Sequence, residues 1–202
     1  MKIYCVTKQV SVAIPTSRGS FNLIYYSNTK DAKEHLALVM GNVTGQENVL
    51  TRVHSECFTG EVLGSLRCDC ADQLIDSMDM IGAKGQGVII YLRQEGRGIG
   101  LLEKLKAYQL QDMGLDTIDA NLALGHQSDE RDYDLVKPVL EDLQVKSIDL
   151  ITNNPMKIDM IKSLGIVVKN VISIPPKINE HNRKYIKAKV TRMQHNIEIS
   201  EI

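Results

Sequence analysis

Three of the four cysteines lie within fourteen residues of one another, at Cys57, Cys68 and Cys70. Ten residues separate the first from the second and one separates the second from the third, so one loop could gather all three thiolates around a divalent ion. Thiolates favour zinc over magnesium or calcium. Three protein ligands on a tetrahedral zinc leave a fourth position for water, which is typical of catalytic rather than structural zinc. The spacing therefore predicts a zinc hydrolase.

Other interpretations of these cysteines stay open. His54 could close a structural zinc site, or the cysteines could be ordinary buried thiols. The spacing does not match the paired knuckles of zinc fingers and ribbons. Disulfides are disfavoured, because Cys68 and Cys70 are two positions apart and the chain shows no secretory signal. Cys5 lies in a predicted strand, and we expect it to be a small core residue.

A glycine-rich segment, residues 93–100, joins a predicted buried strand to a predicted helix. Such turns bring backbone N–H groups close to phosphate oxygens, and the helix N-terminus adds positive potential. Arg93 and Arg97 could each bind a phosphate through two N–H groups. The segment matches neither the Walker loop nor the dinucleotide fingerprint, so the alternative is a tight turn without a ligand.

A second strand-to-helix turn lies at residues 152–155, where Pro155 suits the first turn of a helix. Lys157 follows in that turn, where a cation opposes the helix dipole. An anion bound there would explain the lysine. The alternative is that Asn154 simply caps the helix.

Three further residues could take part in catalysis. Glu56, beside Cys57, could carry protons for a metal-bound water, or it could be a solvated loop charge. Asp129 opens an acidic and basic run whose simplest interpretation is the charged start of a helix. Tyr108, one of seven tyrosines, would more often be a core residue than a catalytic one.

The elements that must position these residues change in period along the chain. Alternating apolar residues predict strands over 2–13, 20–26, 34–40 and 48–54, with the first two joined as a hairpin. We expect these N-terminal strands to be antiparallel.

From residue 70 onward, helical and strand patterns alternate, as in α/β proteins. The sequence thus predicts a single-domain α/β fold with a mixed sheet, antiparallel at its N-terminal strands and flanked by helices. In the helix over 99–113, Leu101, Leu102, Leu105 and Tyr108 share one face and Lys104 faces away. The predicted helices are 70–83, 99–113, 129–143, 155–164 and 180–194, the predicted strands are 88–92, 147–152 and 166–174, and residues 115–128 are predicted to be a loop.

Composition limits the classes of function. The chain has 202 residues, 43% hydrophobic and 24% charged, as in soluble globular proteins. Its net charge of -1 argues against non-specific nucleic-acid binding. No apolar run approaches the roughly 18 residues of a membrane span, and the N-terminus does not resemble a signal peptide. We therefore expect a cytoplasmic protein with reduced thiols and with neither a nucleic-acid nor a membrane partner.

Four segments, in this order, together resemble GTP cyclohydrolase II, the enzyme that commits GTP to riboflavin synthesis. The resemblance spans roughly residues 10–195 and implies one GTP cyclohydrolase II-like domain over residues 1–202, without the dihydroxybutanone phosphate synthase domain of the fused enzymes. The segments are 54–60 (His-Ser-Glu-Cys-Phe-Thr-Gly), 65–70 (Ser-Leu-Arg-Cys-Asp-Cys), 93–101 (Arg-Gln-Glu-Gly-Arg-Gly-Ile-Gly-Leu) and 152–155 (Thr-Asn-Asn-Pro).

The resemblance implies a reaction. GTP and water would give formate, pyrophosphate and 2,5-diamino-6-(5-phosphoribosylamino)pyrimidin-4(3H)-one, the first step of riboflavin biosynthesis. One Zn²⁺ per chain, held by Cys57, Cys68 and Cys70, would bind the water that attacks C8 of the guanine. Mg²⁺ would accompany the triphosphate, and the protein would be a homodimer.

The resemblance also implies residue roles. Asp129 carries over as a proton acceptor, Arg131 as a nucleophile at the α-phosphorus and Tyr108 as a further active-site residue. The implied GTP contacts are Arg52, Val53, His54, Ser55, Glu56, Gln73, Glu95, Gly96, Arg97, Thr117, Thr152 and Lys157.

The role of Arg131 admits a second interpretation. An arginine, with a pKa above about 12, is a poor nucleophile, and the neighbouring Asp129 favours its charged form. Arg131 could instead bind the departing pyrophosphate as a cation.

Two other functions stay open: a paralogue that uses the same zinc pocket on another nucleotide, and a non-catalytic GTP-binding regulator. The regulator is disfavoured because Tyr108, Asp129 and Arg131 are present together with the three cysteines.

Overall fold

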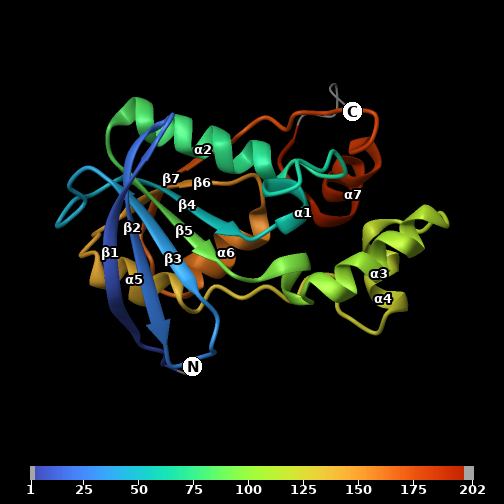
Figure 1. Cartoon of the computed structure of the whole chain (residues 1–202), viewed down its shortest axis with the longest axis horizontal. Helices are drawn as coiled ribbons and strands as arrows, with labels where there is room; N and C mark the ends of the chain where they lie inside the picture. The colour runs from blue at the N-terminus through green and yellow to red at the C-terminus, as the bar shows by residue number, and fades with distance from the viewer. Residues whose placement is uncertain (1–2, 198–202) are drawn as a thin grey trace. The chain divides into compact units, whose positions relative to one another are not determined.

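The computed structural model describes residues 3–197, which form two compact units. Unit 1 comprises residues 3–54, 74–93 and 133–174, and unit 2 comprises residues 55–73, 94–132 and 175–197. Figure 1 shows the course of the chain. The prediction of one domain over residues 1–202 stays a prediction.

Unit 1 is built on one mixed sheet, which confirms the predicted α/β class. Within residues 3–197 the sheet has seven strands in the order β1-β2-β3-β5-β4-β6-β7. The pairs β1–β2, β2–β3 and β3–β5 are antiparallel, whereas β4–β6 and β6–β7 are parallel. The strands are β1 (Val6–Thr16), β2 (Gly19–Asn28), β3 (His35–Met40), β4 (Val49–Ser55), β5 (Gly87–Leu92), β6 (Ile148–Ile151) and β7 (Val168–Ile172).

The strand β4 departs from the antiparallel arrangement predicted for the first 55 residues, because it pairs in parallel with β6. Its pattern explains why: all of its residues from Val49 to His54 are buried. Parallel strands that are covered on both faces have continuous buried runs.

The helices agree with prediction in most places. Three predicted helices are confirmed over nearly the predicted ranges, which were 70–83, 155–164 and 180–194. The helices are α1 (Phe58–Glu61), α2 (Cys70–Lys84), α3 (Leu101–Asp112), α4 (Thr117–Ala123), α5 (Val136–Asp142), α6 (Pro155–Ser163) and α7 (Arg183–Met193), and a 3-10 helix, η1, spans Glu95–Gly98.

Two apolar clusters fill unit 1, one on each face of the sheet. Successive residues of β5 point to opposite faces: Ile89 packs with Ile81 of α2, and Ile90 packs in the cluster that holds Val139 of α5 and Ile161 of α6. The strand therefore needs a continuous apolar sequence. None of the helices in residues 3–197 combines the length and apolar character needed to traverse a lipid bilayer.

The helix predicted over 129–143 begins only at Val136. The Asp129 carboxylate accepts the backbone N–H of Arg131 at 3.1 Å, and such local bonds compete with helix formation. Pro138 lies in the first turn of α5, where its missing N–H removes no intrahelical bond. A proline at this position is compatible with a helix that starts at Val136.

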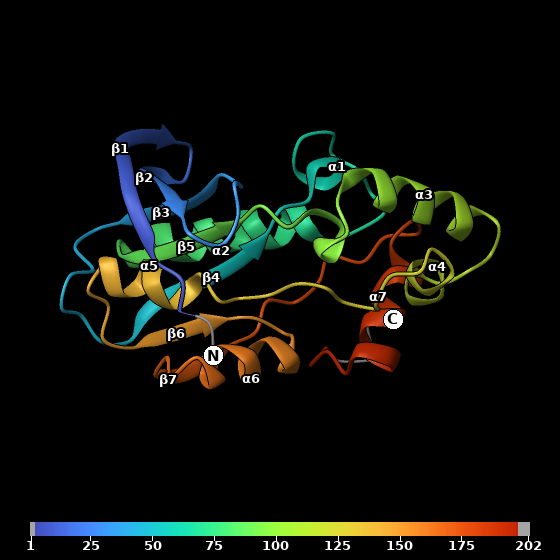
Figure 2. The ribbon, with the colours of Figure 1, turned by 90° about the horizontal axis from the view of Figure 1, so that it is seen from below.

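Residues 115–128 contain a helix, α4, rather than the predicted loop. The Asp116 side chain accepts the backbone N–H groups of Ile118 and Asp119 and so caps α4. Helices α3 and α4 lie side by side in unit 2 (Figure 2). The apolar residues of α4 show no clear helical period, so the helix was missed. The capping residue Asp116 was the signal in the sequence that could have revealed it.

The predicted apolar face of α3 is largely exposed. Leu102 is 66% and Leu105 is 45% exposed, while Lys104, predicted to face away from the protein, has a side chain only 11% exposed. The direction assigned to α3 was therefore wrong.

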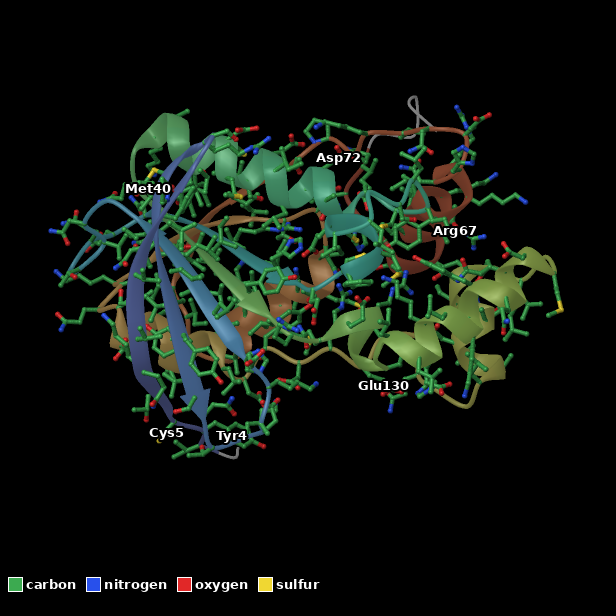
Figure 3. All side chains as sticks on the ribbon, viewed as in Figure 1. Tyr4, Cys5, Met40, Arg67, Asp72 and Glu130 are labelled. Carbon is green, nitrogen blue, oxygen red and sulfur yellow. The ribbon has the colours of Figure 1, made fainter. Side chains whose placement is uncertain are left out.

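Cys5 is exposed and not the core residue that was predicted. It precedes β1 at the N-terminal end of that strand (Figure 3). The strand β1 lies at the edge of the sheet, and nine of its eleven residues are exposed.

Candidate active site

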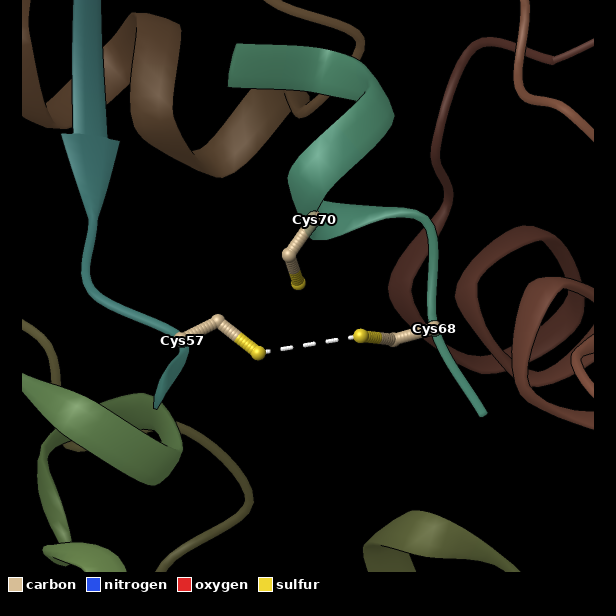
Figure 4. A group of neighbouring side chains, drawn as sticks. All are labelled: Cys57, Cys68 and Cys70. Atoms are coloured by element: carbon tan, nitrogen blue, oxygen red, sulfur yellow. Dashed lines mark hydrogen bonds between the residues drawn. The ribbon is translucent and has the colours of Figure 1, made fainter. Parts of the chain in front are cut away.

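The three clustered cysteines of unit 2 point their sulfur atoms toward one another (Figure 4). The three Sγ atoms lie within 4.8 Å of one another, and those of Cys57 and Cys68 are 3.6 Å apart. Two thiolates on a tetrahedral zinc, each about 2.3 Å from the metal, lie about 3.8 Å from each other. The spacing and the all-sulfur donor set therefore fit zinc.

Backbone hydrogen bonds hold the loop that carries Cys57. Cys57 precedes α1, and its N–H donates to Glu61 Oε1 at 2.9 Å. The next N–H, that of Phe58, donates to Glu95 Oε2 at 2.6 Å. Cys70 is the first residue of α2. The starts of α1 and α2 and the buried Glu95 carboxylate thus fix the positions of Cys57 and Cys70.

Gly60 leaves room for the sulfur atoms. A Cβ atom at this position would lie 3.1 Å from Cys68 Sγ and 3.2 Å from Cys57 Sγ, closer than nearly all real Cβ contacts. A side chain here would push two candidate ligands apart.

We therefore expect Gly60→Ala to weaken zinc binding about 10-fold, the loss typical of changes next to metal ligands. Zinc affinity would be measured by competition with a chromogenic chelator. Val62→Ala is the matched control, because Val62 lies just after α1 and is 67% exposed. Equal zinc affinities for the two variants would contradict the prediction.

Lys104 is a member of the site that the sequence did not reveal. Its Nζ donates to Cys57 Sγ at 3.1 Å and to Glu95 Oε1 at 2.7 Å. Burial alone would lower the pKa of Lys104, but the Cys57 thiolate and then Glu95 raise it above its usual value. Hydrogen bonds from Cys68 and Cys70, together with Lys104, hold the pKa of Cys57 well below its usual range. A cation therefore accompanies a thiolate at this centre.

A pocket within unit 2 contains the three cysteines and most of the predicted residues of this unit. Asp129 and Gln73 do not line it. Its lining includes Ser55, Glu56, Glu95, Gly96, Arg97, Tyr108, Thr117 and Arg131 from the predicted set, and Arg67, Lys104, Asn121 and Tyr185 from outside that set.

Tyr108 faces this pocket as a neutral phenol. Its hydroxyl lies 3.3 Å from Thr59 Oγ1, and the Arg67 guanidinium lies 4.8 Å from its ring centroid. Burial is the main cause that raises the pKa of Tyr108. The side chain can therefore donate a hydrogen bond at neutral pH.

Asp129 and Arg131 form a nearly buried ion pair, with side chains 9% and 15% exposed. Arg131 Nε donates to Asp129 Oδ1 at 2.8 Å, and its Nη2 donates to Oδ2. Burial would raise the pKa of Asp129, but the hydrogen bonds and charge of Arg131 hold it below its usual value. The pair thus keeps an ionised carboxylate and a protonated guanidinium together.

Arg97 joins the glycine-rich turn to the segment that carries this pair. It has a left-handed backbone, with φ 62°. Its carbonyl accepts the Glu130 N–H at 2.9 Å, and its Nη1 donates to the Ser128 carbonyl at 3.3 Å. Among the described residues, nothing hydrogen-bonds to its buried Nη2. An anion in the pocket would satisfy that group.

Gly98 allows the glycine-rich turn to lie close to the backbone of Glu130. A Cβ atom there would lie 2.7 Å from the Glu130 carbonyl oxygen, and φ is +96°. We expect Gly98→Ala to displace the Asp129–Arg131 segment. The kcat of a reaction catalysed in this pocket should then fall about 100-fold, since small misplacements of reacting groups have effects of this size. Gly100→Ala is the control, because φ there is +88° but nothing lies within 4 Å. Equal kcat values for the two variants would contradict this prediction.

Most of the chain matches a known protein family. The sequence profile of the family described as GTP cyclohydrolase II matches residues 7–173. This chain belongs to the GTP cyclohydrolase II family. The resemblance inferred from the four motifs is confirmed.

Curated relatives of this GTP cyclohydrolase II family member fall into two kinds. GTP cyclohydrolase-2 of Aeromonas hydrophila is 47% identical over 190 residues, covering 94% of this chain and 96% of the relative. The riboflavin biosynthesis protein RibBA of Bacillus subtilis is 48% identical over 191 residues, covering 94% of this chain and 48% of the relative. RibBA of Phocaeicola vulgatus is 46% identical, covering 97% and 48%. The chain thus spans about half the length of the RibBA relatives.

The GTP contacts that the family resemblance implies in unit 1 are buried and have protein partners. Arg52 Nη1 donates to the Ile151 carbonyl at 3.0 Å, and Lys157 Nζ donates to the Val53 carbonyl at 2.7 Å. The His54 ring stacks on Tyr91, with centroids 5.6 Å apart. Their roles toward GTP stay predictions.

Two other expectations for unit 1 concern its turns. Asn154 caps α6 by accepting the Lys157 N–H at 3.4 Å, as the simpler alternative held, and the Thr152 hydroxyl accepts the Asn154 N–H at 3.1 Å. This cap uses the backbone N–H of Lys157, so the predicted contact of the Lys157 side chain with an anion stays a prediction. Arg93 is not among the residues that line the pocket of unit 2.

Tyr185 and Lys104 are two of the pocket residues that lie outside the predicted set. Tyr185 lies on α7, where the buried residues are Ile186, Ala188, Lys189 and Met193. A lysine within that apolar face was the signal that could have drawn attention to α7.

Proposed function

We propose that the chain hydrolyses GTP to formate, pyrophosphate and 2,5-diamino-6-(5-phosphoribosylamino)pyrimidin-4(3H)-one, as the first step of riboflavin biosynthesis. One observation carries the proposal: the three converging thiols line the same pocket as Tyr108, Arg97 and Arg131. Membership of the family supports the substrate, and the name of the Aeromonas relative supports the reaction.

Water is needed at two places in this reaction. One molecule hydrolyses the anhydride linkage between the α- and β-phosphates: its oxygen bonds to the α-phosphorus and the bond from that atom to the bridging oxygen breaks, which releases pyrophosphate and leaves the α-phosphate on the ribose. Two more add at C8 of the guanine, open the five-membered ring and release that carbon as formate. The pocket must therefore hold both a purine ring and a polyphosphate.

Cys57, Cys68 and Cys70 would hold Zn²⁺, a Lewis acid that lowers the pKa of a coordinated water. Lys104, 3.1 Å from Cys57 Sγ, offsets part of the charge of the three thiolates. Glu56 lines the pocket beside Cys57 and is our candidate for accepting a proton during ring opening. The Tyr108 phenol would donate a hydrogen bond to the purine.

Arg97 and Arg131 would bind the phosphates, with Mg²⁺ on the triphosphate. Asp129 holds the Arg131 guanidinium through two side-chain hydrogen bonds, so the guanidinium is oriented before substrate binds. A fixed cation that meets charge as it develops on the leaving pyrophosphate stabilises the transition state. We therefore propose that Arg131 acts as a cationic clamp rather than as a nucleophile.

A cytoplasmic homodimer is the remaining part of the proposal, and it follows from the composition and the family resemblance. Size-exclusion chromatography with light scattering would give twice the mass of the 22.6 kDa chain. A single-chain mass at the concentrations of the activity assay would contradict the homodimer.

The deciding experiment incubates GTP and Mg²⁺ with zinc-loaded protein and with chelator-treated protein, and it quantifies formate, pyrophosphate and the pyrimidine together. We expect all three products from the zinc-loaded protein, and we expect formate and the pyrimidine to be lost on chelator treatment and to return when zinc is restored. No product from folded, zinc-loaded protein would refute the GTP assignment. Turnover of a different nucleotide would then favour the paralogue, and tight GTP binding without turnover would favour the regulator.

A further inference from the structure

A buried ion pair connects the C-terminal helix to the loop between two candidate metal ligands. Lys189 on α7 donates from Nζ to Asp69 Oδ1 at 2.5 Å, and the two side chains are 8% and 0% exposed. Asp69 lies between Cys68 and Cys70. The helix α7 lies beyond residues 7–173, which the family profile matches.

Both oxygens of the Asp69 carboxylate have a partner. Oδ1 accepts from Lys189, and Oδ2 accepts from Gln73 Nε2 at 2.6 Å. A buried carboxylate is unfavourable without a counter-cation. Lys189 is that cation, so it fixes the carboxylate of the residue that lies between Cys68 and Cys70.

The same face of α7 reaches the pocket one turn earlier. Tyr185 lines the pocket, and Lys189 Nζ lies 4.7 Å from its ring centroid. The Arg97 guanidinium lies 5.8 Å from the same ring. Residues four positions apart on a helix share a face, so α7 contributes a wall of the pocket and the support of the cysteine loop together.

We propose that Lys189 is a positioning residue for the metal centre: through Asp69 it holds Cys68 and Cys70 in the arrangement that they share with Cys57. The proposal rests on the zinc site of the proposed function. Substitution of a residue that orients a metal ligand typically lowers metal affinity about 10- to 100-fold. Gln73, implied above as a GTP contact, would belong to the same supporting group.

The test compares Lys189→Met with Lys189→Arg and with Lys187→Met, whose lysine is exposed on the same helix. Cobalt titration of each reduced, metal-free protein gives an affinity and a thiolate-to-metal absorption band. We expect Lys189→Met to bind Co²⁺ about 10- to 100-fold more weakly with an altered band, Lys189→Arg to recover part of the affinity, and Lys187→Met to match the native protein. Equal affinity for Lys189→Met and Lys187→Met would overturn the proposal.

A second measurement needs no variant and covers the case in which Lys189→Met does not fold. Hydrogen–deuterium exchange of the native protein would be followed with and without zinc. If α7 supports the cysteine loop, zinc must slow exchange in α7 as well as in residues 57–70, because the coupling is reciprocal. Unchanged exchange in α7, with protection confined to the loop, would overturn the proposal.

The outcomes separate this proposal from the one on which it rests. If native protein shows no cobalt band and Cys57→Ser changes nothing, the metal centre itself is refuted together with the role of Lys189. If native protein binds cobalt through its thiolates and Lys189→Met binds it equally well, only the role of Lys189 is refuted.

Discussion

Cys68→Ser is expected to abolish formate release from GTP and to leave the protein folded. Cys68 is 8% exposed, and serine occupies nearly the same volume. A serine hydroxyl is a poor zinc ligand at neutral pH, so zinc content should fall from about one per chain towards none. The rate of formate release should fall by more than about 100-fold, since even changes outside the ligand set cost 10- to 100-fold.

The measurement for Cys68→Ser pairs metal analysis with a coupled formate assay. Cys5→Ser is the matched control, because Cys5 is an exposed cysteine of the same chain. It should keep native zinc content and native rate. A zinc-free Cys68→Ser protein that released formate at the native rate would refute the role of zinc.

Arg131→Met is expected to lower the rate of pyrophosphate release by about 100- to 1000-fold, the loss seen when one group that stabilises transition-state charge is removed. The substitution also leaves Asp129 without its partner in a site where its side chain is 9% exposed. Thermal unfolding must therefore be followed in parallel. Arg183→Met, at an exposed position, controls for loss of a positive charge.

The clamp and nucleophile roles of Arg131 differ in one measurable respect. A nucleophile would form a phosphoryl-enzyme linkage, whereas a clamp forms none. GTP labelled at the α-phosphorus would be mixed with native protein and quenched within one turnover. We expect no label on the protein, and a labelled adduct that disappears in Arg131→Met would contradict the clamp.

Much of the fold could be predicted because its cause is local. The continuous apolar run of β5 follows from burial on both faces of the sheet, with Ile89 and Ile90 in different clusters. The start of α5 was missed because Asp129 forms bonds with Arg131 that no apolar period records. The parallel pairing of β4 was missed because its partner, β6, lies about a hundred residues further along the chain.

The convergence of Cys57, Cys68 and Cys70 could be predicted because three closely spaced cysteines in one loop can gather their sulfur atoms around a metal ion. Lys104 could not, because the leucines of α3 gave the wrong face and the cysteine beside its ammonium group lies 47 residues earlier. Lys189 contacts Asp69 across 120 residues. Contacts of this kind depend on the folded chain, so a pattern within one segment cannot reveal them.

The distance of 3.6 Å between Cys57 Sγ and Cys68 Sγ also makes these two cysteines susceptible to oxidation. A cysteine with a lowered pKa is present as the thiolate, which is the form that oxidants attack. Its neighbour stands ready to resolve the sulfenic acid as a disulfide. Zinc would block this route while it is bound. If the ion were lost in an oxidising buffer, a disulfide between Cys57 and Cys68 would form. The protein could then bind metal again only after a reductant had cleaved that disulfide.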